Sequence, residues 1–230
     1  QLLASFAIPS ILAMLVSSLY NIVDQIFIGQ GVGYLGNAAT NVAYPLSTIC
    51  LAIALLIGVG SAASFNLNLG AGRQEAARRV VGSAVTMMVV LGLAYMVVLE
   101  LFAPQLLRLF GGTDSVMPYA LTYTRITAVG MPLLILTNAI SNLIRADGSP
   151  RFSMVCMLLG AIINTILDAV FIFLCHWGVA GAAWATVIGQ AARLNPPKNR
   201  EAPAGASRFC FCVTAAWGPG PCWCGPGPGR

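Results

Sequence analysis

Six runs of mostly apolar residues follow one another along this chain, and their length limits what the chain can fold into. They cover about residues 2–29, 43–69, 80–103, 119–144, 153–175 and 178–192. A helix needs about 20 apolar residues to cross the hydrocarbon core of a bilayer, whereas membrane β-strands show alternation over about ten residues. The sixth run loses its apolar character after Ala192 and is short by this measure. We therefore predict an all-α integral membrane bundle of six transmembrane helices.

The composition supports a membrane protein. Of the 230 residues, 58% are hydrophobic and 8% are charged, whereas soluble domains contain about 25% charged residues. Residues 1–190 contain seven arginines and six acidic residues, and residues 191–230 contain five basic residues and one acidic residue. The positive net charge therefore lies mainly at the end of the chain. Because no basic stripe is interleaved with aromatic residues, we expect membrane lipid and not nucleic acid as a partner.

Arginines are distributed unevenly between the connections, which predicts an orientation. The alternate connections at residues 70–79 and 145–151 contain five arginines, whereas the opposite connections contain Arg108, with Arg125 inside the fourth run. Cytoplasmic loops of membrane proteins are enriched in Lys and Arg. We expect both arginine-rich connections and the N-terminus to be cytoplasmic.

Residues 193–230 differ from everything before them. They contain seven of the 13 prolines and show neither helical periodicity nor strand alternation. We predict a disordered Pro/Gly/Cys-rich tail that follows a helical unit at residues 1–192, and we interpret it as an out-of-frame or misassembled end. A metal knuckle formed by its CFC and CWC segments is the alternative, although zinc sites usually have Cys-x₂₋₄-Cys spacing.

Two aspartates lie inside apolar runs. Asp24 lies in LVSSLYNIVDQIFIG, and Asp168 lies in LLGAIINTILDAVFIFL. An acid at membrane depth costs about 2.5 to 3.5 kcal/mol on insertion scales, and such residues usually face a partner or a wet cavity where ions or protons are handled. Both aspartates are therefore candidate ion-binding residues.

Polar residues recur at helical spacing beside the two acids. Spacings of three and four place side chains on one helix face. Asn164 precedes Asp168 by four residues, and Thr186 lies in the next run. The candidate cavity-lining residues are Ser17, Tyr20, Asn21, Asn138 and Gln190.

Carboxylate, amide and hydroxyl oxygens can bind a monovalent cation, and two neighbouring carboxyl groups favour uptake of a proton. We expect Na⁺ or H⁺ as the bound ion, with no other metal and no cofactor. The alternative is that each acid hydrogen-bonds neighbouring helices and serves packing alone. The same alternative applies to Asn138 and Asn142, which are four residues apart in the fourth run.

Several segments jointly resemble bacterial members of the multidrug and toxic compound extrusion (MATE) family. The likeness extends over residues 1–190 in the order and spacing of that family. AIPSILAMLVSSLYNIVDQIFIGQGVG resembles the first helix of that family, and NLNLGAGRQEAARRVVG resembles the loop after its second helix. NAISNLIRADGSPRFSM resembles the segment that joins its fourth and fifth helices, while NTILDAVFIF and GVAGAAWATVIGQ resemble its fifth and sixth helices.

The resemblance implies one lobe of a twelve-helix transporter in a bacterial plasma membrane. Such transporters exchange Na⁺ or H⁺ for cationic or amphipathic organic compounds, including drugs, by alternating access. By motif match, Asp24 and Asp168 would bind the coupling ion together with Asn164 and Thr186, and Asn138 would face the cavity. The second lobe of the same transporter is then the missing partner of this chain.

Three rival interpretations can be stated. An intramembrane aspartyl protease would show a Tyr-Asp pair and a Gly-x-Gly-Asp motif, but Asp24 follows Val23 and Asp168 follows Leu167, so we expect no enzyme. A lipid-linked oligosaccharide flippase of the same superfamily would favour Arg and Lys in its cleft, whereas the membrane-depth positions here hold acids and amides, with Arg125 as the one exception. The third interpretation is a non-functional fragment.

Overall fold

The computed structural model describes the backbone of residues 2–148 and 150–194, and the side chains of this part except those of residues 2–10, 13, 17 and 151. Within it the chain forms six α-helices, one short π-helix and no strand. The elements are α1 (Leu2–Gly31), α2 (Tyr34–Gly70), α3 (Gln74–Leu109), α4 (Met117–Ala146), α5 (Pro150–Ala169), η1 (Val170–Leu174) and α6 (Val179–Leu194). The expected all-α bundle of six helices is confirmed.

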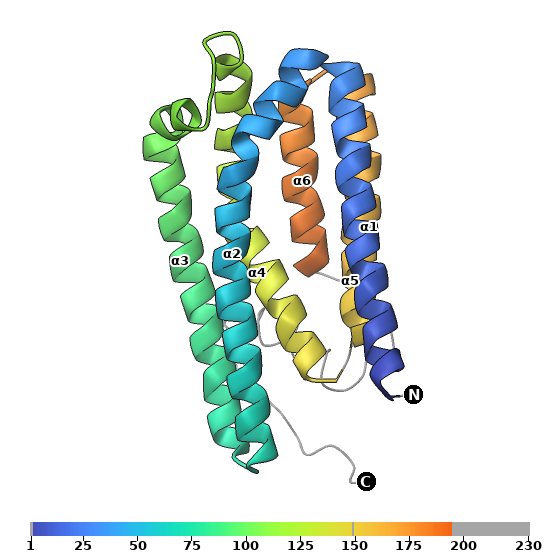
Figure 1. Cartoon of the computed structure of the whole chain (residues 1–230), viewed down its shortest axis with the longest axis vertical. Coiled ribbons are helices and arrows are strands. Elements are labelled where there is room, and N and C mark those ends of the chain that lie inside the picture. The colour runs from blue at the N-terminus through green and yellow to red at the C-terminus, as the bar shows by residue number, and fades with distance from the viewer. Residues whose placement is uncertain (1, 149, 195–230) are drawn as a thin grey trace.

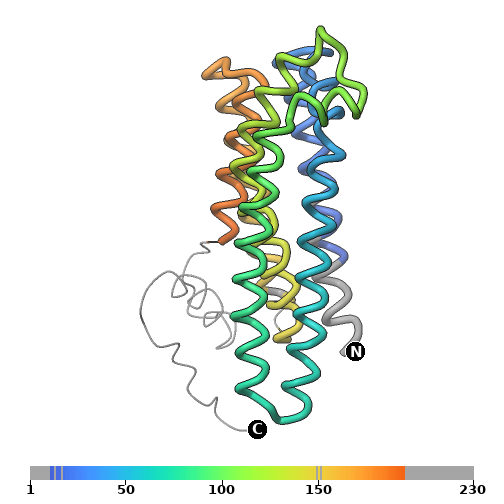
Figure 2. The backbone as a smooth tube through the Cα atoms, turned by 90° about the vertical axis from the view of Figure 1, so that its left-hand side faces the viewer, coloured from blue at the N-terminus to red at the C-terminus, as the bar shows by residue number. Residues whose placement is uncertain are grey.

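The helices run back and forth between two ends of the bundle (Figure 1). The α1–α2, α3–α4 and η1–α6 connections lie at one end, and the α2–α3 and α4–α5 connections lie at the other (Figures 1 and 2). The α2–α3 turn depends on Gly72, whose φ of 73° lies in the left-handed region that glycine adopts without steric cost. Short turns of this kind make neighbouring helices antiparallel.

Helix α4 packs against α2, α3 and α6, whereas α5 packs between α1 and α6. Two glycines allow close approach to α4. A Cβ atom on Gly58 of α2 would lie 2.8 Å from Ala139 Cα, and one on Gly92 of α3 would lie 2.9 Å from Pro132 Cα. Small residues serve the same purpose at helix contacts in membranes generally, where backbones must approach closely to gain van der Waals contact.

Four helices of the described part are long and apolar enough to cross a membrane: Tyr34–Gly70, Gln74–Leu109, Met117–Ala146 and Phe152–Leu174. Large apolar side chains such as Leu56 and Leu101 are exposed on them, as expected for a surface that faces lipid. Helix α6 has 16 residues and ends partway along the bundle (Figure 1). The chain is therefore a multi-pass membrane protein.

The connections differ from the expected ones. The segment between the first two apolar runs, where the sequence predicts a connection, is mostly helix, since α1 continues to Gly31 and α2 begins at Tyr34. Helix α3 likewise begins at Gln74 and continues past Pro104, which the sequence had placed in a loop. Uncharged or amphipathic segments can extend a helix beyond the apolar run. A prediction from hydropathy alone therefore made these helices too short. The predicted tail, including its CFC and CWC segments, lies outside the described residues from residue 195 onward.

Candidate functional site

The two membrane-depth acids lie together inside the bundle. Asp24 of α1 and Asp168 of α5 lie close enough for their carboxyl groups to interact directly with each other. Asp168 is completely buried and Asp24 is half-buried. The Oδ1 atom of each carboxyl group is buried without a hydrogen-bond partner among the described residues. Two carboxylates this close repel each other when both are ionised, so the arrangement is chemically suited to a proton or small cation between them.

Apolar residues one turn further along hold the acids in register. Ile28 follows Asp24 by four residues, and Ile172 follows Asp168 by four residues. Both isoleucines are buried in a small apolar cluster with Ala182 of α6. This cluster fixes α1 and the end of α5 against α6, so the acids lie next to each other at its edge.

The π-helix η1 begins two residues after Asp168 and belongs to this arrangement. π-turns widen a helix locally and often occur at functional sites. Here the widened turn directs Ile172 inward, and it brings Phe173 to Phe27 of α1 in an edge-to-face contact with 5.6 Å between ring centroids. The sequence contained no signal for this element.

Asn164 connects Asp168 to α6. It lies one turn before Asp168 on α5 and is buried. In the amide orientation that satisfies both ends, Nδ2 donates to Asp168 Oδ2 at 3.3 Å and the amide oxygen accepts from the backbone N–H of Thr186 at 3.2 Å. The Thr186 hydroxyl donates to the carbonyl oxygen of Ala182 at 3.0 Å. Thr186 therefore meets Asn164 through its backbone, and the four predicted ion-site residues lie together.

Two tyrosines adjoin the acids. Tyr123 of α4 lies near enough to Asp24, Asp168 and Tyr20 to interact with them electrostatically. Tyr20 is half-buried, and the guanidinium carbon of Arg193 lies 5.4 Å from its ring centroid. Tyr20 was among the residues predicted from the sequence, whereas Tyr123 was missed. The sequence feature that could have pointed to Tyr123 was the group of tyrosine and threonine residues at 122–127, inside an apolar run.

A cavity of about 40 Å³ lies beside this cluster, between α2, α4 and α6. Its polar lining residues are Ser47, Tyr123, Thr127, Thr186 and Gln190. A polar cavity needs roughly 10 to 15 Å³ to hold a water molecule, so this one has room for water. Since Tyr123 and Thr186 belong to both places, the cavity and the acid pair form one continuous polar region.

Of the other predicted cavity residues, Gln190 lines this cavity, whereas Asn138 and Asn21 do not. Gln190 is buried, and its Oε1 atom accepts from the Thr137 hydroxyl at 3.0 Å, which joins α6 to α4. Asn138 donates to the carbonyl oxygen of Leu134 within its own helix at 2.9 Å. Asn21 has an exposed side chain. The side chain of Ser17 lies outside the described residues.

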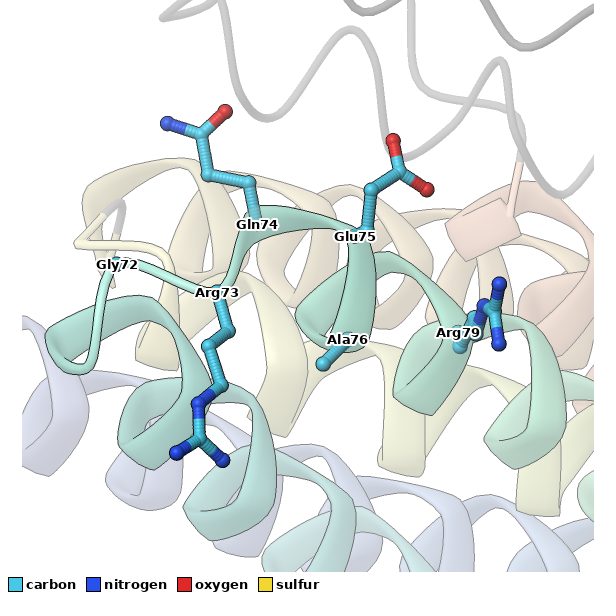
Figure 3. A pocket seen from close by; sticks show the side chains of 6 residues that line it. All are labelled: Gly72, Arg73, Gln74, Glu75, Ala76 and Arg79. Carbon is cyan, nitrogen blue, oxygen red and sulfur yellow. The ribbon is translucent and has the colours of Figure 1, made fainter.

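A larger hollow of about 620 Å³ lies at the α2–α3 turn, far along the chain from either acid. Figure 3 shows that its side chains do not converge, because Arg73 points away from Gln74 and Glu75. Arg78 makes an exposed ion pair with Glu75 at 3.3 Å, and exposed pairs of this kind contribute little. The polar region around Asp24 and Asp168 is therefore the better candidate site.

A family model described as MatE matches residues 9–170, which is more than half of the chain. The chain belongs to the MatE family. MatE proteins are membrane transporters, and the recognition made from the sequence segments is confirmed.

Curated MatE relatives are similar over the helical part. The multidrug export protein MepA of Staphylococcus haemolyticus is 30% identical over 190 residues, which are 81% of this chain and 41% of that protein. The probable multidrug resistance protein YoeA of Bacillus subtilis is 28% identical over 191 residues, again 81% of this chain and 41% of that protein. The chain thus spans about two fifths of the length of these relatives.

A solved MatE structure agrees with the fold. The multidrug transporter DinF-BH superposes with a TM-score of 0.80 at 37% identity, over 83% of this chain and 43% of that one. The helices described above therefore correspond to part of a longer transporter fold.

Proposed function

We propose that this chain forms one lobe of a cation-coupled antiporter that exports cationic or amphipathic organic compounds by alternating access. The observation that supports the proposal most strongly is the pair of facing carboxyl groups of Asp24 and Asp168, each with one unpartnered buried oxygen among the described residues. The names of relatives such as MepA support multidrug compounds as the exported class. A second lobe would complete the path for the compound.

The charge of the acid pair would couple ion binding to the position of the helices. With a proton or Na⁺ between the carboxyl groups, α1 and α5 can remain in contact. When the ion leaves, two close negative charges in a medium of low dielectric constant repel each other strongly. A change in the spacing of α1 and α5 would then follow ion release, and it would alter the cavity that Tyr123 and Thr186 share with the acids.

The distribution of arginines supports an orientation of the chain in the membrane. Arg73 lies in the α2–α3 turn, Arg78 and Arg79 follow in the first two turns of α3, and the α4–α5 turn lies at the same end of the bundle (Figure 1). We place that end and the N-terminus on the cytoplasmic side of a bacterial plasma membrane. The coupling ion would then enter from the opposite side.

The test is efflux from proteoliposomes. Residues 1–190 are joined to the second lobe of a relative such as MepA, and export of a cationic dye is followed under an imposed Na⁺ or H⁺ gradient. We expect gradient-driven export that is lost in Asp24→Asn and in Asp168→Asn but kept in Asp114→Asn, a change in an exposed loop. Equal export by all three variants would contradict the proposal. Movement of a lipid-linked pyrophosphate in place of the dye would instead favour the flippase interpretation.

A further inference from the structure

We propose that Gly189 of α6 is a positioning residue for the ion site, because it leaves the space that Asn164 needs to reach both Asp168 and the backbone of α6. The inference rests on the proposed function and deepens it. Gly189 itself does not touch the bound ion. Its role is to set the distance between α5 and α6 at the level of Asn164.

The contacts at Gly189 are made with rigid atoms. A Cβ atom there would lie 2.9 Å from Asn164 Cβ and 3.1 Å from the carbonyl oxygen of Gly160. Separations under 3.0 Å require a neighbour to move, and neither atom is the far end of a flexible side chain. A methyl group at position 189 therefore separates the helices or displaces Asn164.

Displacement of Asn164 would break the contacts that define the site. Its amide oxygen accepts from Thr186 N–H at 3.2 Å, and its Nδ2 donates to Asp168 Oδ2 at 3.3 Å. Neither contact tolerates a shift of about half an ångström, since hydrogen bonds weaken beyond about 3.5 Å. The amide is a donor to the ionised form of Asp168, so its loss disfavours that form.

Gly160 faces Gly189 across the same interface but differs in kind. A Cβ atom at Gly160 would lie against the side chain of Arg193, nearest its Cγ, Nε and Cδ atoms. Because the Arg193 guanidinium also lies over the Tyr20 ring beside the acids, Gly160→Ala would disturb the site by a second route and does not serve as a control. Gly92→Ala, which meets the Pro132 backbone between α3 and α4, is the matched control for a rigid contact elsewhere.

The experiment uses the full 230-residue chain in lipid and follows the infrared band of protonated carboxyl groups as pH is raised. In wild type we expect a band that disappears with rising pH and is absent in Asp24→Asn and Asp168→Asn. In Gly189→Ala the midpoint should move to higher pH by about one unit, the size expected for a lost hydrogen bond to a charged group. Asn164→Ala should show the same shift, and adding Gly189→Ala to it should change nothing further.

The outcomes separate the two proposals. A wild-type midpoint in Gly189→Ala overturns the role of Gly189 and leaves the proposed function intact. A similar shift in Gly92→Ala also overturns it, since the effect would then be one of general packing. Absence of any Asp-dependent band in wild type overturns the proposed function and this inference with it.

A compensating variant serves as the control for loss of folding. If Gly189→Ala alone does not insert, Gly189→Ala/Asn164→Gly should, because it removes the Cβ atom that the new methyl group would meet. Its midpoint should match that of Asn164→Ala. Failure of both chains to insert contradicts the proposed contact.

Discussion

Asp24 of α1 and Asp168 of α5 lie close enough across the contact between their helices for the two carboxyl groups to interact directly. Their neighbours support this placement in two ways. Ile28 and Ile172, each four residues further along, share a buried apolar cluster. Asn164, one turn earlier on α5, donates to Asp168 at 3.3 Å and also bonds the backbone of α6. An acid pair held by these contacts can relieve its repulsion only if the helices themselves move, so its charge state is linked to the packing of the helices.

The ion site should depend on the amide of Asn164 and little on the hydroxyl of Thr186. The Thr186 hydroxyl bonds Ala182 of its own helix, and its link to Asn164 comes from the backbone. Thr186→Val should leave ion affinity within about twofold of wild type, whereas Asn164→Leu should weaken it by about tenfold or more. Ion-dependent stabilisation against heat measures both affinities. Equal losses in the two variants would show that the hydroxyl binds the ion.

Thr137 and Gln190 should stabilise the contact between α4 and α6 through their buried hydrogen bond of 3.0 Å. A double-mutant cycle with Thr137→Val and Gln190→Leu should give a coupling energy of about 0.5 to 1.5 kcal/mol. Unfolding of the chain in detergent provides the four free energies. A coupling energy near zero would mean that the two side chains do not bond in the membrane-embedded protein.

Gly92→Ala should destabilise the bundle, because the new Cβ atom would lie 2.9 Å from the Cα atom of Pro132. Overpacking of this kind costs about 1 to 3 kcal/mol. Gly82→Ala on the same helix has nothing within 4 Å of the added atom and should be neutral or slightly stabilising. Thermal unfolding in detergent compares them, and equal midpoints would show that α3 and α4 are not in close contact.

The proposed orientation predicts opposite labelling at the two ends of the bundle. In a cysteine-free background, Gln74→Cys in the α2–α3 region should react with an impermeant maleimide only after the cytoplasmic side is exposed. Thr113→Cys in the α3–α4 connection should react in intact cells, and both positions are exposed. The reverse pattern would contradict the placement derived from the arginines.

Much of this arrangement could be predicted from the sequence. Apolar runs predicted the helices, and the cost of a charge in lipid pointed to Asp24 and Asp168 before any contact was known. Helical spacing also paired Asn164 with Asp168. What the sequence did not contain was the information carried by contacts between distant segments.

The π-helix η1 and the site neighbour Tyr123 illustrate that limit. Tyr123 became a site residue only because α4 packs near both acids. The role of Thr186 likewise depends on how closely α6 approaches α5, which a glycine at position 189 permits. Such distances depend on packing of several helices at once, and periodicity within one helix cannot fix them.

The most direct test of the account is whether the two acids titrate as one unit. The carboxyl infrared band is measured against pH and Na⁺ for wild type, Asp24→Asn, Asp168→Asn and the double variant in lipid. A shared ion predicts that either single change removes the ion-dependent band almost completely and that the double variant looks the same. If each single variant kept about half of the wild-type signal, the acids would titrate independently and the shared site would be ruled out.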